Sequence, residues 1–373
     1  MQTSATYICP VRGLTGLEPP EADRLGQAAG VAKNLGIERL LLPVLEESLT
    51  GSVRSKVTAL DGFVQALDRI AEAGITAWLI APAQKVLGLN WVPPYLAGAV
   101  RDPKASPVFV DRRVRNLRPF DWWADPTIIK KRIGTFREVM TALSGHPALK
   151  GWLILDRAME WGRPDFHAAD IMLRAFLAEI RDRDESSDIY LGLGWSELLD
   201  PEITQILAGQ VDGLHVSGLE HRPPDIGMAH NLAGELIVAA YLGSLAQWLF
   251  ECSVEVEIGW GMLDRAVDLE EIGEAGRQLV GRGPAGTTWL SLIDPQPGLY
   301  GHPPWCLRRG LEGVGLLNHG VEPKEEIVAL LEEFRSTEQT GSTDDFIDIS
   351  REEYLEDPYT HLPRLWDHFR ESL

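Results

Sequence analysis

The chain has 373 residues, a length that suits one large α/β barrel with an extension. Its formal net charge of −20 would repel phosphates, so the composition argues against a nucleic-acid partner. The three scattered cysteines, Cys9, Cys252 and Cys306, match neither a disulfide framework nor the spacing of metal ligands.

The amino-terminal segment 1–13 has no basic start followed by an apolar run, so we expect no signal peptide. We also expect no membrane partner, because we find no stretch that approaches the roughly 20 apolar residues of a membrane span. These features predict a reduced cytoplasmic location.

Eight short apolar runs alternate with amphipathic helical stretches, which is the order of parallel β/α units. Several runs are apolar on both faces, as strands covered by helices must be. No glycine-rich phosphate turn follows the first run, which argues against a doubly wound open sheet and favours a (β/α)8 TIM barrel of the α/β class. The predicted strands are 6–11, 39–44, 76–82, 151–156, 189–195, 211–217, 254–260 and 287–293.

Helix boundaries are marked by capping residues. Asp125-Pro126 and Asp200-Pro201 each supply an N-cap followed by a proline in the first turn. Gly74 is expected to end the preceding helix in the left-handed conformation.

The connection 83–125 is too long for a simple loop between strand and helix, and it holds Trp91, Tyr95, Trp122 and Trp123. Loops that follow barrel strands lie over the site, so we interpret it as a lid or a cleft wall.

The composition changes after Arg335, which divides the chain into a barrel, 1–335, and an acidic tail, 336–373. A disordered tail would hold fewer aromatic residues than this one, which includes Tyr354 and Trp366. We expect the tail either to pack on the barrel or to contact a protein partner or a second copy.

Segments in chain order resemble clan A glycoside hydrolases, in particular their cellulase-like members, over about residues 5–335. Each segment is weakly diagnostic, and their order carries the resemblance. The segments are LGIERLLLPV (35–44), ALDRIAEAGITAWLI (66–80), SGHPALKGWLIL (144–155), VEIGW (256–260), TTWLSLIDP (287–295) and GVGLLNHGVEPKEEIVALL (313–331).

The resemblance implies that Glu257 is the nucleophile and that Trp289 forms the floor of the first sugar subsite. It makes His215 a polar residue of the cleft. Trp195 and Trp260, at strand ends, are further candidates for stacking on sugar rings. Spacing alone favours the alternative that Glu257 is a buried acid held in an ion pair.

The departures from the family are more numerous than the matches. The family's Asn-Glu pair after the fourth strand aligns with Asp156 and Arg157. Its second-strand arginine aligns with Leu41, and its sixth-strand tyrosine aligns with Ser217.

An arginine cannot act as the acid/base, because its pKa lies above about 12. Arg157 can instead bind substrate or pair with Glu257, and we expect such a pair, shared with Asp156, to hold Glu257 ionised. Asp156, Glu160 and Glu197 are candidate replacements for the missing acid.

Three functions follow from this pattern. The favoured one is a glycoside hydrolase-like protein that binds a saccharide and lacks ordinary retaining hydrolysis. The others are an active glycosidase or transglycosidase with Glu257 as nucleophile and a relocated acid/base, and a non-catalytic structural subunit. No cofactor is implied, and no metal-ligand pattern involves the nine histidines.

Overall fold

The fold is taken from a computed structural model of the chain. The structure describes residues 1–8, 19–50, 52–87, 89–101, 107–110, 113–119, 123, 125–161, 164–217, 226, 231–260, 268–302, 305–307, 310–338 and 344–373.

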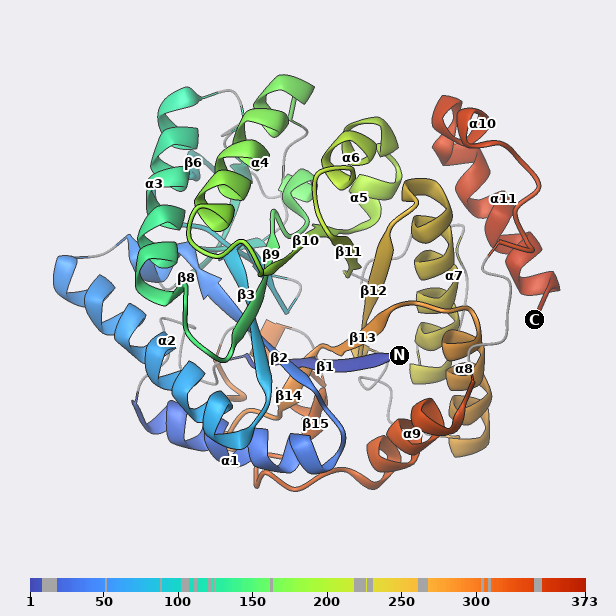
Figure 1. Cartoon of the computed structure of the whole chain (residues 1–373), viewed down its shortest axis with the longest axis horizontal. Helices are drawn as coiled ribbons and strands as arrows, with labels where there is room; N and C mark the ends of the chain where they lie inside the picture. The colour runs from blue at the N-terminus through green and yellow to red at the C-terminus, as the bar shows by residue number, and fades with distance from the viewer. Residues whose placement is uncertain are drawn as a thin grey trace.

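Eight parallel strands close into a barrel, which confirms the predicted (β/α)8 fold (Figure 1). Each strand pairs with its neighbour in a continuous circuit that runs from β1 back to β2. In spatial order the strands are β1 (Gln2–Thr6), β13 (Gly286–Trp289), β12 (Ser253–Ile258), β11 (Gly213–Val216), β10 (Asp188–Leu193), β9 (Leu149–Ile154), β3 (Thr76–Ala83) and β2 (Arg39–Leu45).

The helices begin and end largely where the capping residues predict. Asp125 caps α3 and accepts from the amide of Thr127, and Gly74 ends α2 with φ +70°. The helices are α1 (Pro19–Asn34), α2 (Val53–Ala73), α3 (Pro126–Leu143), α4 (Phe166–Arg181), α5 (Trp195–Leu198), α6 (Pro201–Ala208), α7 (Leu232–Phe250), α8 (Leu269–Gly281), α9 (Glu325–Ser336), α10 (Arg351–Glu356) and α11 (Pro358–Glu371).

Two strand predictions need correction at their bounds. The first strand is Gln2–Thr6 and not 6–11, because Gln2 to Ala5 pair with Gly286 to Trp289. Residues 9–11 lie outside the described residues. The predicted strand 287–293 is two strands, β13 and β14 (Ser291–Ile293), and β14 pairs with β15 (Gly315–Leu317) outside the barrel.

The long connection after β3 contains a small sheet of its own. Its strand order is β4-β5-β7-β8-β6, and β4 continues almost directly from β3. A buried network holds this sheet to the barrel: Tyr95 donates to Glu46, which also accepts from Arg132 of α3 at 3.0 Å. The strands are β4 (Lys85–Val86), β5 (Leu89–Trp91), β6 (Ala97–Arg101), β7 (Pro107–Val110) and β8 (Arg113–Pro119).

The amino-terminal half of the barrel interior holds a buried ion pair between Arg39 of β2 and Glu255 of β12. The Arg39 guanidinium also donates to the Ser4 hydroxyl at 3.0 Å and lies 3.7 Å from the centre of the Trp78 ring. Interior side chains repeat every second residue along a strand, so Glu257 follows Glu255 on the inner face, nearer the carboxyl end.

The tail packs on the chain's own barrel, along α7 (Figure 1). Its rings Phe346, Trp366 and Phe369 surround Tyr241 of α7, whose hydroxyl donates to the carbonyl of Leu362 at 2.6 Å. The tail aromatics that drew attention in the sequence are therefore core residues.

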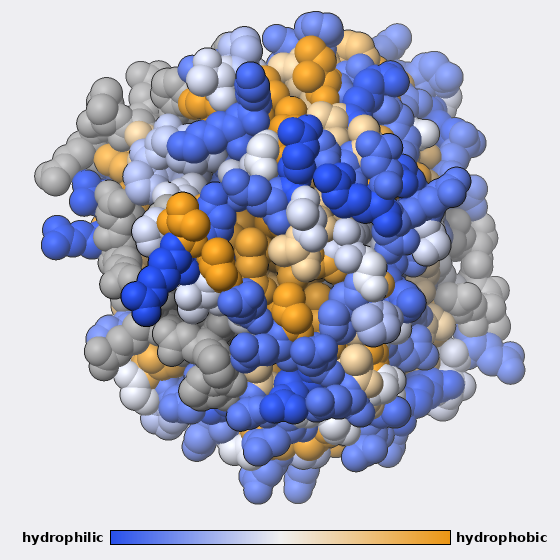
Figure 2. Space-filling model, turned by 60° about the vertical axis from the view of Figure 1, so that its left-hand side comes forward, coloured by the Kyte–Doolittle hydropathy of each residue, from blue (hydrophilic) through white to orange (hydrophobic). Residues whose placement is uncertain are grey.

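Helix α7 is more apolar than the sequence analysis allowed. Among the described residues it is the one helix long and apolar enough to cross a membrane, and 89% of its most apolar window is buried inside the fold. Figure 2 brings forward the side of the molecule opposite α7, and that face is largely hydrophilic with apolar side chains near its middle. The apolar helix is thus a core element between barrel and tail.

We expect Trp366→Ala to lower the free energy of unfolding by about 3–5 kcal/mol, because this fully buried ring fills the contact between tail and barrel. Tyr359→Ala, on the same helix but 71% exposed, should cost less than about 0.5 kcal/mol. Urea denaturation of both variants checks this, and equal losses would contradict the packing described.

Candidate functional site

A cavity opens at the carboxyl ends of the barrel strands, where TIM-barrel enzymes carry their active sites. It contains about 360 Å³ of empty space, part of which is open solvent. Five of the predicted site residues line this cavity: Asp156, Arg157, His215, Glu257 and Trp260. The closed barrel therefore brings together most of the predicted site.

The turn after β9 places Asp156 and Arg157 in this cavity. Leu155 and Arg157 have φ of 49° and 48°, a left-handed conformation that is costly for residues with side chains. Gly192 of β10 makes room for this turn, since a Cβ there would lie 2.5 Å from the Asp156 Cα. The Arg157 amide donates to the Gly192 carbonyl at 3.2 Å.

The Arg157 guanidinium is buried and holds two neighbours. Its Nη2 lies 3.3 Å from the Asp156 carboxylate and donates to the Lys85 carbonyl at 3.2 Å. Arg157 thereby joins the β9 turn to β4 of the small sheet. Glu257 lines the same cavity, and its predicted pairing with Arg157 stays a prediction.

Glu257 is positioned by the segment that follows β12. The Trp260 indole donates to Glu257 Oε1 at 3.3 Å. The backbone amides of Gly259 and Trp260 both donate, at 3.0 Å, to the fully buried carboxylate of Glu235 in α7. Glu235 thus fixes the segment that carries Trp260.

His215 of β11 lines the cavity with 2% of its surface exposed. Neither ring nitrogen has a hydrogen-bond partner among the described residues. Burial lowers its pKa from 6.5 to about 4, so the imidazole is neutral at pH 7. A neutral imidazole offers one donor and one acceptor to a ligand.

Glu197 accepts hydrogen bonds from backbone amides and does not line the cavity. Its two oxygens accept from the amides of Met159 at 2.9 Å and Gly194 at 2.8 Å, which ties α5 to the short 3₁₀ turn Ala158–Trp161 after β9. Glu160 belongs to that turn, but its side chain lies outside the described part of the chain.

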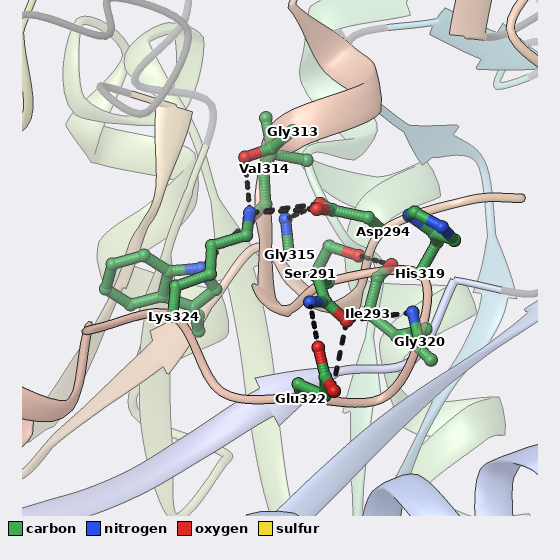
Figure 3. A network of polar contacts seen from close by, with 12 residues as sticks. Ser291, Ile293, Asp294, Gly313, Val314, Gly315, His319, Gly320, Glu322 and Lys324 are labelled. Carbon is green, nitrogen blue, oxygen red and sulfur yellow. Dashed lines mark hydrogen bonds and ion pairs between the residues drawn. The ribbon is translucent and has the colours of Figure 1, made fainter. Parts of the chain in front are cut away.

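Trp289 and Trp195 are both buried and do not line the described cavity. The Trp289 indole donates to the Val314 carbonyl at 3.0 Å. Next to it, the Lys324 ammonium binds the Asp294 carboxylate and the Gly313 carbonyl, in the network drawn in Figure 3. Trp289 thus anchors the segment around Val314 to the end of β13. Its role as a sugar platform stays a prediction.

Two contributors were missed by the sequence analysis. Neither Lys85 nor Glu235 belongs to a recognisable sequence motif. Each contributes through contacts with residues that are distant in the sequence. The interpretation of segment 83–125 as a cleft wall did point to Lys85. Among the described residues, no group of three or more His, Cys, Asp or Glu is arranged to hold a metal ion.

No protein-family model matches the chain, and no curated protein matches it. Solved structures share its fold at low identity. A GH5_18 protein from Streptomyces cattleya, in complex with GlcNAc, has a TM-score of 0.67 at 15% identity, covering 91% of this chain and 82% of that one.

Two further structures are similar. A GH5_18 variant from Bifidobacterium longum subsp. longum ATCC 55813, in complex with Manb1-4GlcNAc, has a TM-score of 0.65 at 15% identity, covering 91% and 80%. The exo-beta-1,4-mannosidase Op5Man5 from Opitutaceae bacterium strain TAV5 has a TM-score of 0.67 at 14% identity, covering 90% and 59%. The chain therefore has a clan A glycoside hydrolase-like (β/α)8 fold.

The His215 environment predicts a pH dependence of stability. Between pH 6.5 and about 4, the unfolded chain binds a proton that folded His215 does not, so this contribution is complete above pH 6.5 and falls with the pH. At pH 5 it should have lost about 2 kcal/mol. Urea unfolding of wild type and His215→Asn at pH 7 and pH 5 checks this; an identical loss in both would contradict it.

Glu235→Ala should lower the free energy of unfolding by about 2–4 kcal/mol, because it leaves two buried amides without their acceptor. Glu235→Gln keeps one acceptor oxygen and should lose less than half of that. Chemical denaturation measures both, and equal losses would show that the amide contacts matter little.

Proposed function

We propose that this protein binds a saccharide at the carboxyl end of its barrel and does not carry out ordinary retaining hydrolysis. The observation that carries the proposal is Arg157, which lines the same cavity as Glu257 where the resemblance calls for a carboxylic acid. Retaining hydrolysis needs two carboxyl groups about 5–5.5 Å apart, one of which lends a proton. Arginine has no proton to lend at neutral pH.

Binding is supported by the chemistry of the cavity. The unpartnered nitrogens of His215 and the carboxylate of Glu257 are the kinds of group that hold sugar hydroxyls. The Trp260 ring adds an apolar surface for a sugar C–H face. Two structural neighbours are in complex with GlcNAc and with Manb1-4GlcNAc, which supports a sugar as the class of ligand.

A second candidate is a glycosidase in which Asp156 replaces the missing acid. Asp156 lines the cavity together with Glu257, which favours it over Glu197. Its contact with Arg157 argues the other way, because that guanidinium already lies 3.3 Å from one oxygen of the carboxylate.

Thermal unfolding with a panel of mono- and disaccharides tests the proposal, alongside turnover of the matching aryl glycosides. A binding sugar at 100 times its Kd should stabilise the fold by about 2.7 kcal/mol, with no turnover by wild type. His215→Ala should weaken that stabilisation, and Val53→Ala, at a 79% exposed position, should not.

If the wild type turns over a glycoside and both Glu257→Gln and Asp156→Asn abolish that turnover, the second candidate replaces the proposal. If no sugar stabilises the fold and none is turned over, both candidate functions are overturned.

A further inference from the structure

Most polar lining residues of the cavity come from one half of the barrel, and most apolar ones come from the other half. The strands β9, β10, β11 and β12 are neighbours in the closed circuit, as are β13, β1, β2 and β3. Each half therefore presents its own continuous wall to a bound molecule.

The first half forms what we term the polar wall, made of Asp156, Arg157, His215 and Glu257. Gly192 leaves β10 without a side chain at this level, and Asp156 occupies the space. Leu153 and the Trp260 ring are the apolar members on this side.

The second half forms the apolar wall: Ile8 after β1, Pro43 of β2, Ile80 of β3 and Leu290 after β13, extended by Val86 of β4. Thr6 and Lys85 are the polar residues among the described members of this half, and the Lys85 carbonyl already accepts a hydrogen bond from Arg157. The wall can therefore receive few of the hydrogen bonds that a hexose offers around its rim.

The charged residues that line the cavity are balanced in number, because Asp156 and Glu257 are matched by Arg157 and Lys85. A further buried charge on the ligand would have to be desolvated without a dedicated counterion. A neutral ligand suits this wall better than an acidic or basic sugar.

We propose that the cavity selects a neutral sugar unit that carries a methyl group on the side opposite its hydrogen-bonding hydroxyls. A hydroxyl pressed against the apolar wall would lose its water partners and gain none, which is costly, whereas a methyl group there gains apolar contact. The inference rests on the proposed saccharide binding and names the sugar class for that site. The methyl can belong to a 6-deoxy group or to an acetamido group.

Matched sugar pairs test this by isothermal titration calorimetry on the full chain. The pairs are 6-deoxyglucose with glucose, 6-deoxygalactose with galactose, and N-acetylglucosamine with glucose. We expect the methyl-bearing member of at least one pair to bind about tenfold more tightly, which is about 1.4 kcal/mol. The pair that responds identifies the source of the methyl group.

Two variants locate the contact. Ile80→Thr and Val86→Thr each place a hydroxyl in the apolar wall, and at least one should reduce the tenfold preference to less than threefold. Val53→Thr, far more exposed, should leave it unchanged. Thermal unfolding of each variant verifies that it is folded.

Equal affinity within every pair, or a preference that both wall variants retain, would overturn the inference while leaving saccharide binding intact. If neither these sugars nor any other sugar in the wider panel binds, the proposed function itself is overturned.

Discussion

The buried ion pair between Arg39 and Glu255 is the constraint on which the rest of the barrel depends. It reaches from β2 to β12 across β1 and β13, and the Ser4 hydroxyl and the Trp78 ring complete the surroundings of the guanidinium. Removing one partner of such a pair commonly costs about 3–5 kcal/mol, because the other charge stays buried. The pair fills the amino-terminal half of the interior, so the cavity lies at the carboxyl ends, where the strand period brings Glu257 to the inner face.

The site is held by backbone-directed carboxylates on two sides. Glu197 binds the amides of Met159 and Gly194 behind the β9 turn, and Glu235 binds those of Gly259 and Trp260 behind β12. The turn itself is left-handed at Leu155 and Arg157, a costly conformation that surrounding structure must maintain. The surrounding contacts fix Arg157 in the cavity. This supports the proposed saccharide binding without ordinary hydrolysis over a site that has simply been lost.

Barrel strands and helix caps could be predicted from sequence because each depends on local pattern, whereas the main cavity residues were predicted from the family resemblance. The apolar runs, the Asp125-Pro126 start and Gly74 all carry their signal within a few residues. Glu197 and Glu235 could not be assigned this way, since the amides of Met159, Gly259 and Trp260 that they bind lie on other elements. The small sheet was read as a loop because its strands are short, and the first strand was placed four residues late because TYICPV is more apolar than QTSAT.

The position of the tail has a consequence for synthesis on the ribosome. Helix α7, which ends at Phe250, depends for cover on rings that begin at Phe346, roughly 100 residues later. At about 5–20 residues per second, the apolar surface that Phe346, Trp366 and Phe369 later bury stays open for several seconds or more, and longer until the last helix leaves the exit tunnel. The tail thus closes an apolar surface of the nascent chain, so a product terminated before the tail would be a natural client for chaperones.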